Sequence, residues 1–225
     1  MREYYFKINS LWKREGWYFD EKKKKDPKFQ QGRYSFIVGD YACPTFANVN
    51  KWRVSEKIDG TSIVVGLEPG ATCHTFSGRT KNSIIPPHLL DVLEEMFDPA
   101  LFNFDERLQG VSIRLFGEGF GPKIQKAGPL YAVEPNFVLF DVLIGRKWCK
   151  RETVDAIAES LNIFSVPDLG IMSTEEVIEY VKGQPLSVFS KQPQVMEGVV
   201  CRPHPMMLYQ DGIPITMKLK TREFR

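Results

Sequence analysis

The chain has 225 residues, which is enough for one large domain with a sizeable core or for two small domains. Hydrophobic residues make up 43% of the sequence and charged residues 26%, as is typical of globular proteins. The formal net charge is only +2. This excludes nucleic-acid binding by the field of the whole chain, so any such binding requires a local basic patch.

The sequence shows neither a targeting signal nor a metal-binding cysteine pattern. Residues 1–6 lack an apolar signal core, and no apolar run is long enough to span a bilayer. The cysteines and histidines stand alone, at Cys43, Cys73, Cys149, Cys201, His74, His88 and His204. Scattered single thiols fit a reducing compartment, so we expect a cytoplasmic protein without a zinc site.

Residues 1–50 are rich in aromatic residues, and their pattern predicts an irregular segment. The run Lys22–Lys25 is either a solvated loop or an edge that contacts phosphate, with the loop favoured. Four aromatic residues could stack on bases, although we expect them to pack the rim of the domain. They are Trp12, Trp17, Tyr18 and Phe19.

Strands are expected next, followed by a helix. From Trp52 to Ser77 the pattern predicts three short strands, broken at Asp59-Gly60 and at Pro69-Gly70. Pro86 and Pro87 then open a helix that runs to about Phe97. Its apolar residues recur at helical spacing and predict one buried face. They are Leu89, Leu90, Leu93, Met96 and Phe97.

The middle of the chain predicts two buried strands and two helices. The strands are Val111–Phe116 and Phe137–Ile144. An amphipathic helix is marked by Val154, Ile157, Ala158 and Leu161. Ser173 and Glu176 form a capping-box pattern, which opens a third helix that ends near Gly183.

The last part of the chain predicts strands. Glu197–Cys201 is one strand, and Met206–Tyr209 with Ile213–Lys220 forms a hairpin around Asp211-Gly212. Because strands dominate and helices do not alternate regularly with them, we expect an α+β fold with antiparallel sheets flanked by helices. No linker or repeat divides the chain, so residues 1–225 are expected to form a single domain.

The most reactive stretch is Glu56-Lys57-Ile58-Asp59-Gly60, between two predicted strands. Lys57 can act as an amine nucleophile, and Asp59 can orient it or hold a bound group. Gly60 would let the backbone approach a phosphate closely. Taken alone, the pattern is more typical of a surface turn, so it needs support from the rest of the chain.

Five further segments supply that support, and with the lysine stretch they form an ordered series. They are Ser77–Thr80, Phe116–Gly119, Phe137–Asp141, Glu197–Val200 and Lys218–Lys220. In this order they resemble the nucleotidyltransferase motifs of ATP-dependent polynucleotide ligases. The resemblance is closest to the RNA ligases that include phage RNA ligase 2 and the kinetoplastid editing ligases, and it runs from about Tyr5 to the last residues.

The resemblance implies that Lys57 attacks the α-phosphorus of ATP, giving a lysyl-AMP and pyrophosphate. Only about one free lysine in a thousand is neutral near physiological pH, and the attack requires the neutral amine. We expect burial, the nearby cations Lys218 and Lys220, and a bound metal to disfavour the charged form. Glu197 is the expected ligand of Mg²⁺ or Mn²⁺, since these ions prefer oxygen donors.

The resemblance also assigns the residues that hold the nucleotide. Lys218 and Lys220 alternate on one face of a strand and would bind the α-phosphate. Glu118, expected at a strand end, would contact the ribose, and Phe140 would stack on adenine unless it belongs to the core. Glu56 would recognise the adenine edge, Arg79 the ribose or the RNA terminus, and Asp141 would be a buried acid that supports the metal site.

Other members of the superfamily are alternatives. DNA ligases usually carry arginine where Ser62 stands, and messenger RNA capping enzymes transfer GMP with the same lysine. A non-catalytic RNA-binding domain is a further alternative. We expect an RNA ligase that joins 5′-phosphate and 3′-hydroxyl ends, in nicked or gapped duplexes. The sequence stops at Arg225, so we expect no second domain and either a minimal ligase, a fragment, or a partner protein that supplies RNA binding.

Overall fold

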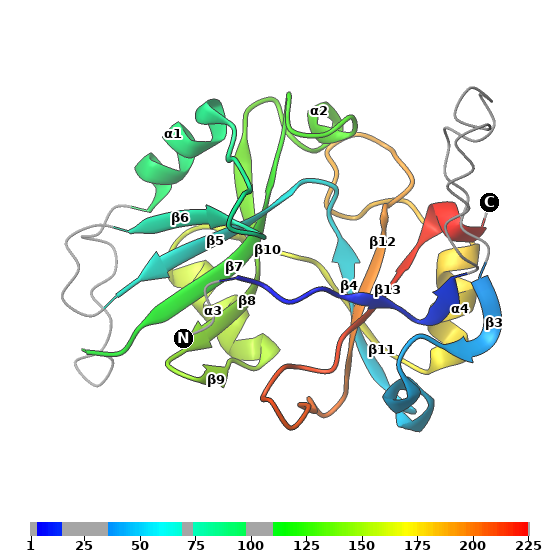
Figure 1. The fold of residues 1–225 in the computed structure, drawn as a ribbon. Coiled ribbons are helices and arrows are strands. Elements are labelled where there is room, and N and C mark those ends of the chain that lie inside the picture. Colours follow the sequence, from blue (N-terminus) through cyan, green and yellow to red (C-terminus); the bar gives the residue numbers. More distant parts are fainter. Residues whose placement is uncertain (1–3, 15–35, 69–73, 98–109, 225) are drawn as a thin grey trace, which may run out of the picture. The chain divides into compact units, whose positions relative to one another are not determined.

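Figure 1 shows the fold in a computed structural model, which describes residues 4–14, 36–68, 74–97 and 110–224. The lysine run at 22–25 lies outside these residues, as do Trp17, Tyr18, Phe19 and Cys73. The chain divides into two compact units that interleave along the sequence. Unit 1 comprises Met1–Lys7, Ile58–Pro167 and Val188–Gln194, and unit 2 comprises Ile8–Lys57, Asp168–Ser187 and Val195–Arg225.

Unit 1 is built on one mostly antiparallel sheet with the strand order β10-β8-β7-β5-β6, and β9 pairs with β8. Only the short pairing of β10 with β8 is parallel among its described ladders. The strands are β5 (Thr61–Leu67), β6 (Thr75–Gly78), β7 (Ile113–Phe120), β8 (Asn136–Ile144), β9 (Lys147–Trp148) and β10 (Phe164–Ser165).

Helices complete the core of unit 1. They are α1 (Pro87–Met96), α2 (Gly128–Tyr131) and α3 (Arg151–Ser160). Helix α1 buries Leu89 and Leu93 against the sheet, and Phe97 lies 5.3 Å from Phe137 in an edge-to-face contact between ring centroids. Val154 of α3 joins the same apolar cluster. The predicted helices at both places are therefore confirmed, together with their buried faces.

Unit 2 is built on a second sheet with the order β1-β13-β12-β4-β11, and β2 pairs with β3 in a separate ribbon. Its elements are β1 (Asn9–Ser10), β2 (Trp12–Arg14), β3 (Phe36–Tyr41), a 3₁₀ helix (Pro44–Asn48), β4 (Trp52–Lys57), β11 (Asp168–Met172), α4 (Thr174–Lys182), β12 (Gly198–Pro203), β13 (Met217–Lys220) and a 3₁₀ helix (Thr221–Phe224).

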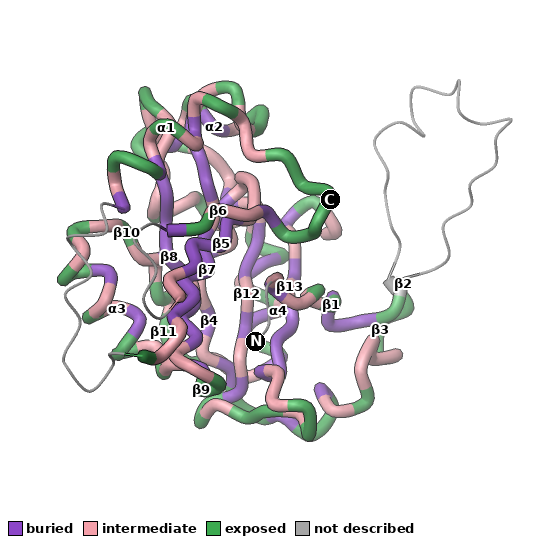
Figure 2. Tube along the Cα trace, turned by 60° about the vertical axis from the view of Figure 1, so that its left-hand side comes forward, coloured by how far each residue is buried: buried purple, intermediate pink, exposed green. Residues whose placement is uncertain are grey.

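One face of this sheet forms the core of unit 2 with α4. Val177 and Val181 of the helix are fully buried in the same cluster as Val54, Val199 and Leu219 of the strands. Figure 2 shows this burial along the centres of the strands, with exposed residues concentrated in the connecting loops. On the other face of the sheet, the central strands β4, β12 and β13 carry mostly polar side chains, and that face carries the candidate site.

Helix α4 begins as the sequence predicts. The Ser173 hydroxyl accepts a hydrogen bond from the Glu176 backbone, and the Glu176 carboxylate accepts one from the Ser173 backbone. This reciprocal pair satisfies two backbone donors that a helix start otherwise leaves without partners. The α+β class with mostly antiparallel sheets is confirmed. Within the described part of the chain, no helix combines the length and apolar character needed to cross a membrane.

One expectation about strands is wrong, and a second holds only in part. Residues 1–50 are not irregular throughout, because β1, β2 and β3 lie there; β1 pairs with β13 from the far end of the chain, a contact without a local signal. The hairpin expected over residues 206–220 is present only in short form around the expected turn. Leu208 bridges Pro214, the N–H of Tyr209 donates to the carbonyl oxygen of Ile213 at 2.8 Å, and that of Ile215 donates to Met207 at 3.0 Å. The residues of β13 pair with β12 and β1 instead.

Candidate functional site

Lys57 is the last residue of β4, and strand alternation sets the direction of its side chain. Along this strand Trp52, Val54 and Glu56 are buried, whereas Arg53, Ser55 and Lys57 are half-buried. Successive side chains of a strand point to opposite faces, so the first set faces the core and the second faces away from it. The apolar residues of β4 thereby hold the lysine on the open face of the unit 2 sheet.

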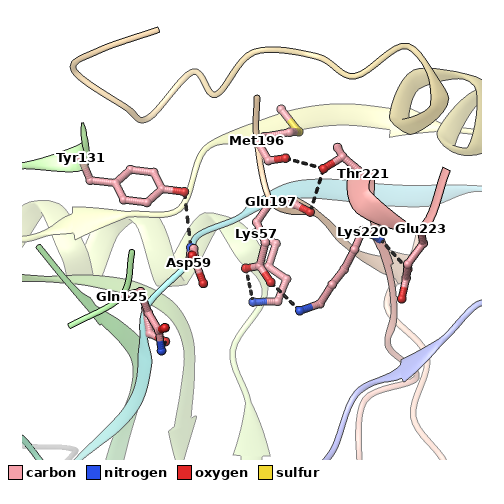
Figure 3. Close-up of polar contacts among 10 residues, drawn as sticks. Lys57, Asp59, Gln125, Tyr131, Met196, Glu197, Lys220, Thr221 and Glu223 are labelled. Carbon is pink, nitrogen blue, oxygen red and sulfur yellow. Dashed lines mark hydrogen bonds and ion pairs between the residues drawn. The ribbon is translucent and has the colours of Figure 1, made fainter. Parts of the chain in front are cut away.

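A single carboxylate lies between two lysines on this face (Figure 3). Oε2 of Glu197 is 2.7 Å from Nζ of Lys57, and Oε1 is 2.5 Å from Nζ of Lys220. All three side chains are well protected from solvent, with 15–20% of their surface exposed. We expected Glu197 only as a metal ligand, and the structure gives it the additional role of joining the two lysines.

The register of the sheet explains why these side chains meet. Strand β12 lies between β4 and β13, and its first residue, Gly198, pairs with Lys57 on one side and with Lys220 on the other. Directly paired residues project to the same face of a sheet. Glu197 precedes β12 and lies outside the strand, so alternation does not set the direction of its side chain; its two hydrogen bonds show that its carboxylate lies on the face of the lysines.

The surroundings keep Glu197 ionised. Burial by itself would raise the pKa of this carboxyl group, but the charges of Lys57 and Lys220 and their hydrogen bonds outweigh burial. The pKa of Glu197 therefore lies below its ordinary value. The site is consequently a fixed anion that bridges two cations near neutral pH.

Backbone contacts hold this carboxylate in place. The N–H of Thr221 donates to the carbonyl oxygen of Glu197 at 3.0 Å, and the Thr221 hydroxyl donates to that of Met196 at 2.8 Å. The backbone N–H of Lys220 donates to Glu223 at 2.9 Å. Figure 3 shows these contacts beside the lysine pair. Our sequence reasoning missed Thr221 and Glu223, and the only available signal was their place directly after the lysine strand.

Lys218 lies on the same strand as Lys220. The two lysines of β13 are half-buried, while Met217 and Leu219, which alternate with them, are buried in the core. The expected alternation is confirmed, and Lys218 therefore lies on the same face as Lys57 and Lys220. Its direct partners across the sheet are Val200 and Ser10.

Glu56 faces the other way, as its position next to Lys57 predicts. It is only 1% exposed, and its carboxylate accepts a hydrogen bond from the Ser187 hydroxyl. Burial raises the pKa of Tyr180, and the negative charge of Glu56 raises it further. A buried carboxylate with these polar neighbours is costly to desolvate, which marks Glu56 as a residue with a specific role in unit 2.

In unit 1, the turn that follows Lys57 is fixed by contacts within the protein. The backbone N–H of Asp59 donates to the Tyr131 hydroxyl at 3.4 Å, and the carbonyl oxygen of Gly60 accepts from Gln125 at 3.2 Å (Figure 3). A Cβ atom at Gly60 would lie 2.2 Å from the carbonyl oxygen of Gly119 in β7. The close approach that requires this glycine is therefore that of the neighbouring strand, which sequence reasoning did not identify.

Unit 1 also carries three residues that we expected to contact the nucleotide. Glu118 is half-buried opposite Ser62, inside β7 and not at a strand end, because the strand continues to Phe120. Arg79 is exposed directly after β6. Phe140 is the extra residue of a bulge, since Phe116 pairs with Asp141 while the next residue, Gly117, pairs with Leu139. Such a bulge redirects a side chain at the point where the ladder is interrupted.

Asp141 is fully buried, as expected. Its Oδ2 accepts a hydrogen bond of 2.5 Å from the Tyr5 hydroxyl, and the Tyr5 ring contacts Phe140 edge to face with centroids 4.9 Å apart. Burial and the charge of Asp141 raise the pKa of Cys149 to about 11. Tyr5 was not among our candidate residues, because nothing in the sequence links the first residues to β8.

Among the described residues, no group of three or more histidine, cysteine, aspartate or glutamate side chains could enclose a metal ion. Glu197 offers a single carboxylate with two oxygen donors. A site of this kind suits an ion that keeps most of its water ligands, as Mg²⁺ does.

The chain was compared with known proteins. The RNA ligase family model matches residues 50–220, while no curated protein sequence matches. Among solved structures, the chain is similar to a mutant of Naegleria gruberi RNA ligase with ATP and Mn, at 18% identity and a TM-score of 0.55, over 78% of this chain and 52% of that one. A second mutant, with AMP and Mn, gives 17% identity and a TM-score of 0.56, over 79% and 52%.

The present chain spans about half the length of the ligases that it matches. At these identities the structural likeness establishes a shared fold. The family model, in contrast, covers well over half of the chain and includes every motif segment from Glu56 to Lys220. The protein therefore belongs to the RNA ligase family.

Proposed function

We propose that this protein is an ATP-dependent RNA ligase that joins 5′-phosphate and 3′-hydroxyl ends of RNA. It would act through a covalent lysyl-AMP and an adenylated RNA intermediate. The observation that carries this proposal is the arrangement of Lys57, Glu197 and Lys220 on one sheet face, with hydrogen bonds of 2.7 and 2.5 Å. Membership of the RNA ligase family supports the same assignment.

In the first step, the Lys57 amine would form a bond to the α-phosphorus of ATP as the bond to pyrophosphate breaks. The amine must first lose a proton. The Glu197 carboxylate stabilises the protonated form while it is paired with Lys57, so the attack requires this ion pair to open. The lysine is then held in place by its strand and directed toward the open face.

The α-phosphate would be held by Lys218 and Lys220, which share that face. Glu197 would hold Mg²⁺ or Mn²⁺, which requires at least one of its ion pairs with Lys57 and Lys220 to open. When bound, such an ion neutralises charge on the transferring phosphate and the leaving group. Asp141, the buried acid of β8, would support the metal site.

The remaining residues would recognise the nucleotide. Phe140 would stack on adenine, and Glu118 would contact the ribose. Glu56 is buried on the face of β4 opposite to Lys57, so its expected contact with the adenine edge gains no support from this arrangement. Arg79, exposed after β6, would contact the ribose or the RNA terminus. Guanidinium groups suit such oxygen-rich partners because they donate in a planar fork.

We also propose that the two interleaved units act together as a single adenylyltransferase domain in the cytoplasm. Its substrates would be nicked or gapped RNA duplexes, with a partner protein assisting RNA binding. The small net charge supports such a partner, because sealing requires several phosphate contacts along the RNA.

The direct test is incubation with α-labelled ATP and Mg²⁺, followed by denaturing gel analysis. We expect a labelled protein band that is absent from Lys57→Ala and preserved in Lys147→Ala, a control at an exposed lysine of β9. Labelling from GTP or NAD⁺ in place of ATP would contradict the assignment, as would labelling of Lys57→Ala.

A second arm separates a ligase from a non-catalytic RNA-binding domain. RNA that already carries a 5′-adenylate skips the first step, so it should be joined more readily than 5′-phosphate RNA. We expect sealing of 5′-phosphate RNA to be weak and to fall as salt rises. If neither RNA is joined and Lys57 is not labelled, the ligase proposal is refuted and a non-catalytic RNA-binding domain is favoured.

A further inference from the structure

The open face of the unit 2 sheet gathers more basic side chains than adenylation uses. Lys57 pairs through Gly198 with Lys220, as described above. Further along the same strands, Arg53 of β4 pairs directly with Arg202 of β12. Arg53 lies four residues from Lys57 on β4, and Arg202 lies four residues from Gly198 on β12. Because side chains alternate along a strand, both arginines project from the face that carries the lysines.

We name this set the basic face. Its members are Arg53, Lys57, Arg202, Lys218 and Lys220, and all of them are half-buried. The opposite face of the same strands is packed against α4 by residues such as Val54, Val199 and Leu219. Those core residues fix the alternation, so the five basic side chains cannot turn to the core side without breaking it.

The pairing of Arg53 with Arg202 is unfavourable by itself. Like charges directly opposite one another destabilise an antiparallel pair. Asp168 moderates this repulsion from β11, with its Oδ2 3.7 Å from Nε of Arg53, which is a long contact for an ion pair. An anionic ligand on this face would add to that compensation.

The geometry fixes the kind of anion. Arg53 lies four residues from Lys57 on β4, which corresponds to roughly 14 Å along the strand. One strand of a nucleic-acid duplex carries a phosphate about every 3.4 Å of helix axis, so the basic face spans about four phosphates. A single phosphate held at Lys57 does not reach the arginines.

We propose that Arg53 and Arg202 bind the phosphodiester backbone of an RNA strand that runs along the basic face toward Lys57. This inference rests on the proposed ligase function, which supplies RNA as the substrate. Arginine suits the task because its planar fork donates two parallel hydrogen bonds to phosphate oxygens. These contacts read the backbone alone, so they position an RNA end without selecting its sequence.

The test measures binding of a 5′-phosphorylated, fluorescently labelled single-stranded RNA by anisotropy, without ATP and across a range of salt concentrations. Loss of one phosphate contact reduces the slope of log affinity against log salt by about 0.7, which corresponds to about fivefold weaker binding near 0.1 M salt. We expect this loss in Arg202→Ala.

Two further variants make the test specific. Lys182→Ala removes the same charge from α4, on the packed side of the sheet, where Lys182 pairs with Glu179 at the surface. It should bind RNA as the wild type does. Asp168→Asn removes a negative charge next to Arg53 and keeps an oxygen that can accept the hydrogen bond from the Gly170 backbone. It should bind RNA more tightly, a gain that unfolding cannot produce.

The outcomes separate this inference from the proposed function. Equal affinities and equal salt slopes for Arg202→Ala and Lys182→Ala would overturn it. Arg202→Ala could instead need a higher ATP concentration for labelling while it binds RNA as the wild type does. That result would assign the arginines to the triphosphate of ATP and would also overturn the inference. Absence of lysyl-AMP in the wild type would refute the ligase assignment alone, since the anisotropy comparison does not depend on ATP.

Discussion

Gly198 offers a sharp test of the lysine site, because it is the residue to which both lysines are paired. A Cβ atom built at this position would lie 2.1 Å from the carbonyl oxygen of Leu219 and 2.7 Å from Cα of Lys220. Both neighbours are backbone atoms of β13, so no side-chain rotation can relieve the contact. Gly198→Ala must therefore push β13 away from β12.

The size of the effect follows from these distances. Ordinary contact begins at about 3.4 Å, so the strands must separate by roughly 1.3 Å at this point. Overpacking of this kind costs about 1–3 kcal/mol, and each kcal/mol lowers Tm by about 2–4 °C in a chain of this size. Because Lys220 moves with β13, its contact with Glu197 opens, and a misplacement of about 1 Å at a reacting centre can reduce the rate by ~100-fold.

The assay compares the rate of lysine labelling from α-labelled ATP with Tm for two variants. Gly183→Ala is the matched control, because a Cβ atom there makes contacts of only 3.4 and 3.5 Å at the end of α4 in the same unit. We expect slow labelling in Gly198→Ala and wild-type labelling in Gly183→Ala, each measured well below Tm. Wild-type labelling in Gly198→Ala would show that the pairing of Gly198 with Lys57 and Lys220 does not position the site.

Two predictions concern buried carboxylates. Tyr5→Phe removes the 2.5 Å hydrogen bond to the fully buried Asp141 and should lower the free energy of unfolding by about 1–3 kcal/mol. Tyr131→Phe is the control, because it loses only a 3.4 Å contact. Equal losses of stability for the two variants in denaturant unfolding would contradict this prediction. The pKa of Glu197 in the folded protein is below its ordinary value of 4.5, so its charge stabilises the fold fully above pH 4.5. This contribution is lost as the pH falls through the lower pKa of the folded state. The stability difference between wild type and Glu197→Gln should therefore shrink with acidification below pH 4.5, and a constant difference would rule this out.

Local signals predicted much of the fold. The capping box at Ser173 and the apolar periodicity after Pro87 gave helices with nearly correct bounds, because both patterns act within a few residues. The pairing of β1 with β13 and the bulge at Phe140 were not predictable. Both depend on which distant strand lies alongside, and sequence periodicity contains no information about that partner.

The candidate site divides in the same way. The motif order identified Lys57, Glu197 and Lys220, but not that one carboxylate joins the two lysines. The lysines come together through the register of three strands, and Glu197 meets them from outside β12. Tyr5 and Thr221 escaped notice because each acts through a contact with a residue distant in sequence or through backbone atoms. The roles of Phe140, Glu118, Glu56 and Arg79 in binding the nucleotide remain predictions.

The orientation of Lys57 depends on the core beneath it. Trp52 is fully buried in β4, and its indole N–H donates to the Thr174 hydroxyl at 3.0 Å. A slip of one residue in β4 would turn Trp52 outward, bring Lys57 into the apolar core and turn Glu56 to the open face. Burying an ammonium group without a partner costs several kcal/mol, and exposing Trp52 adds to that cost. The packing of Trp52 therefore helps to hold Lys57 on the face where ATP and RNA would bind.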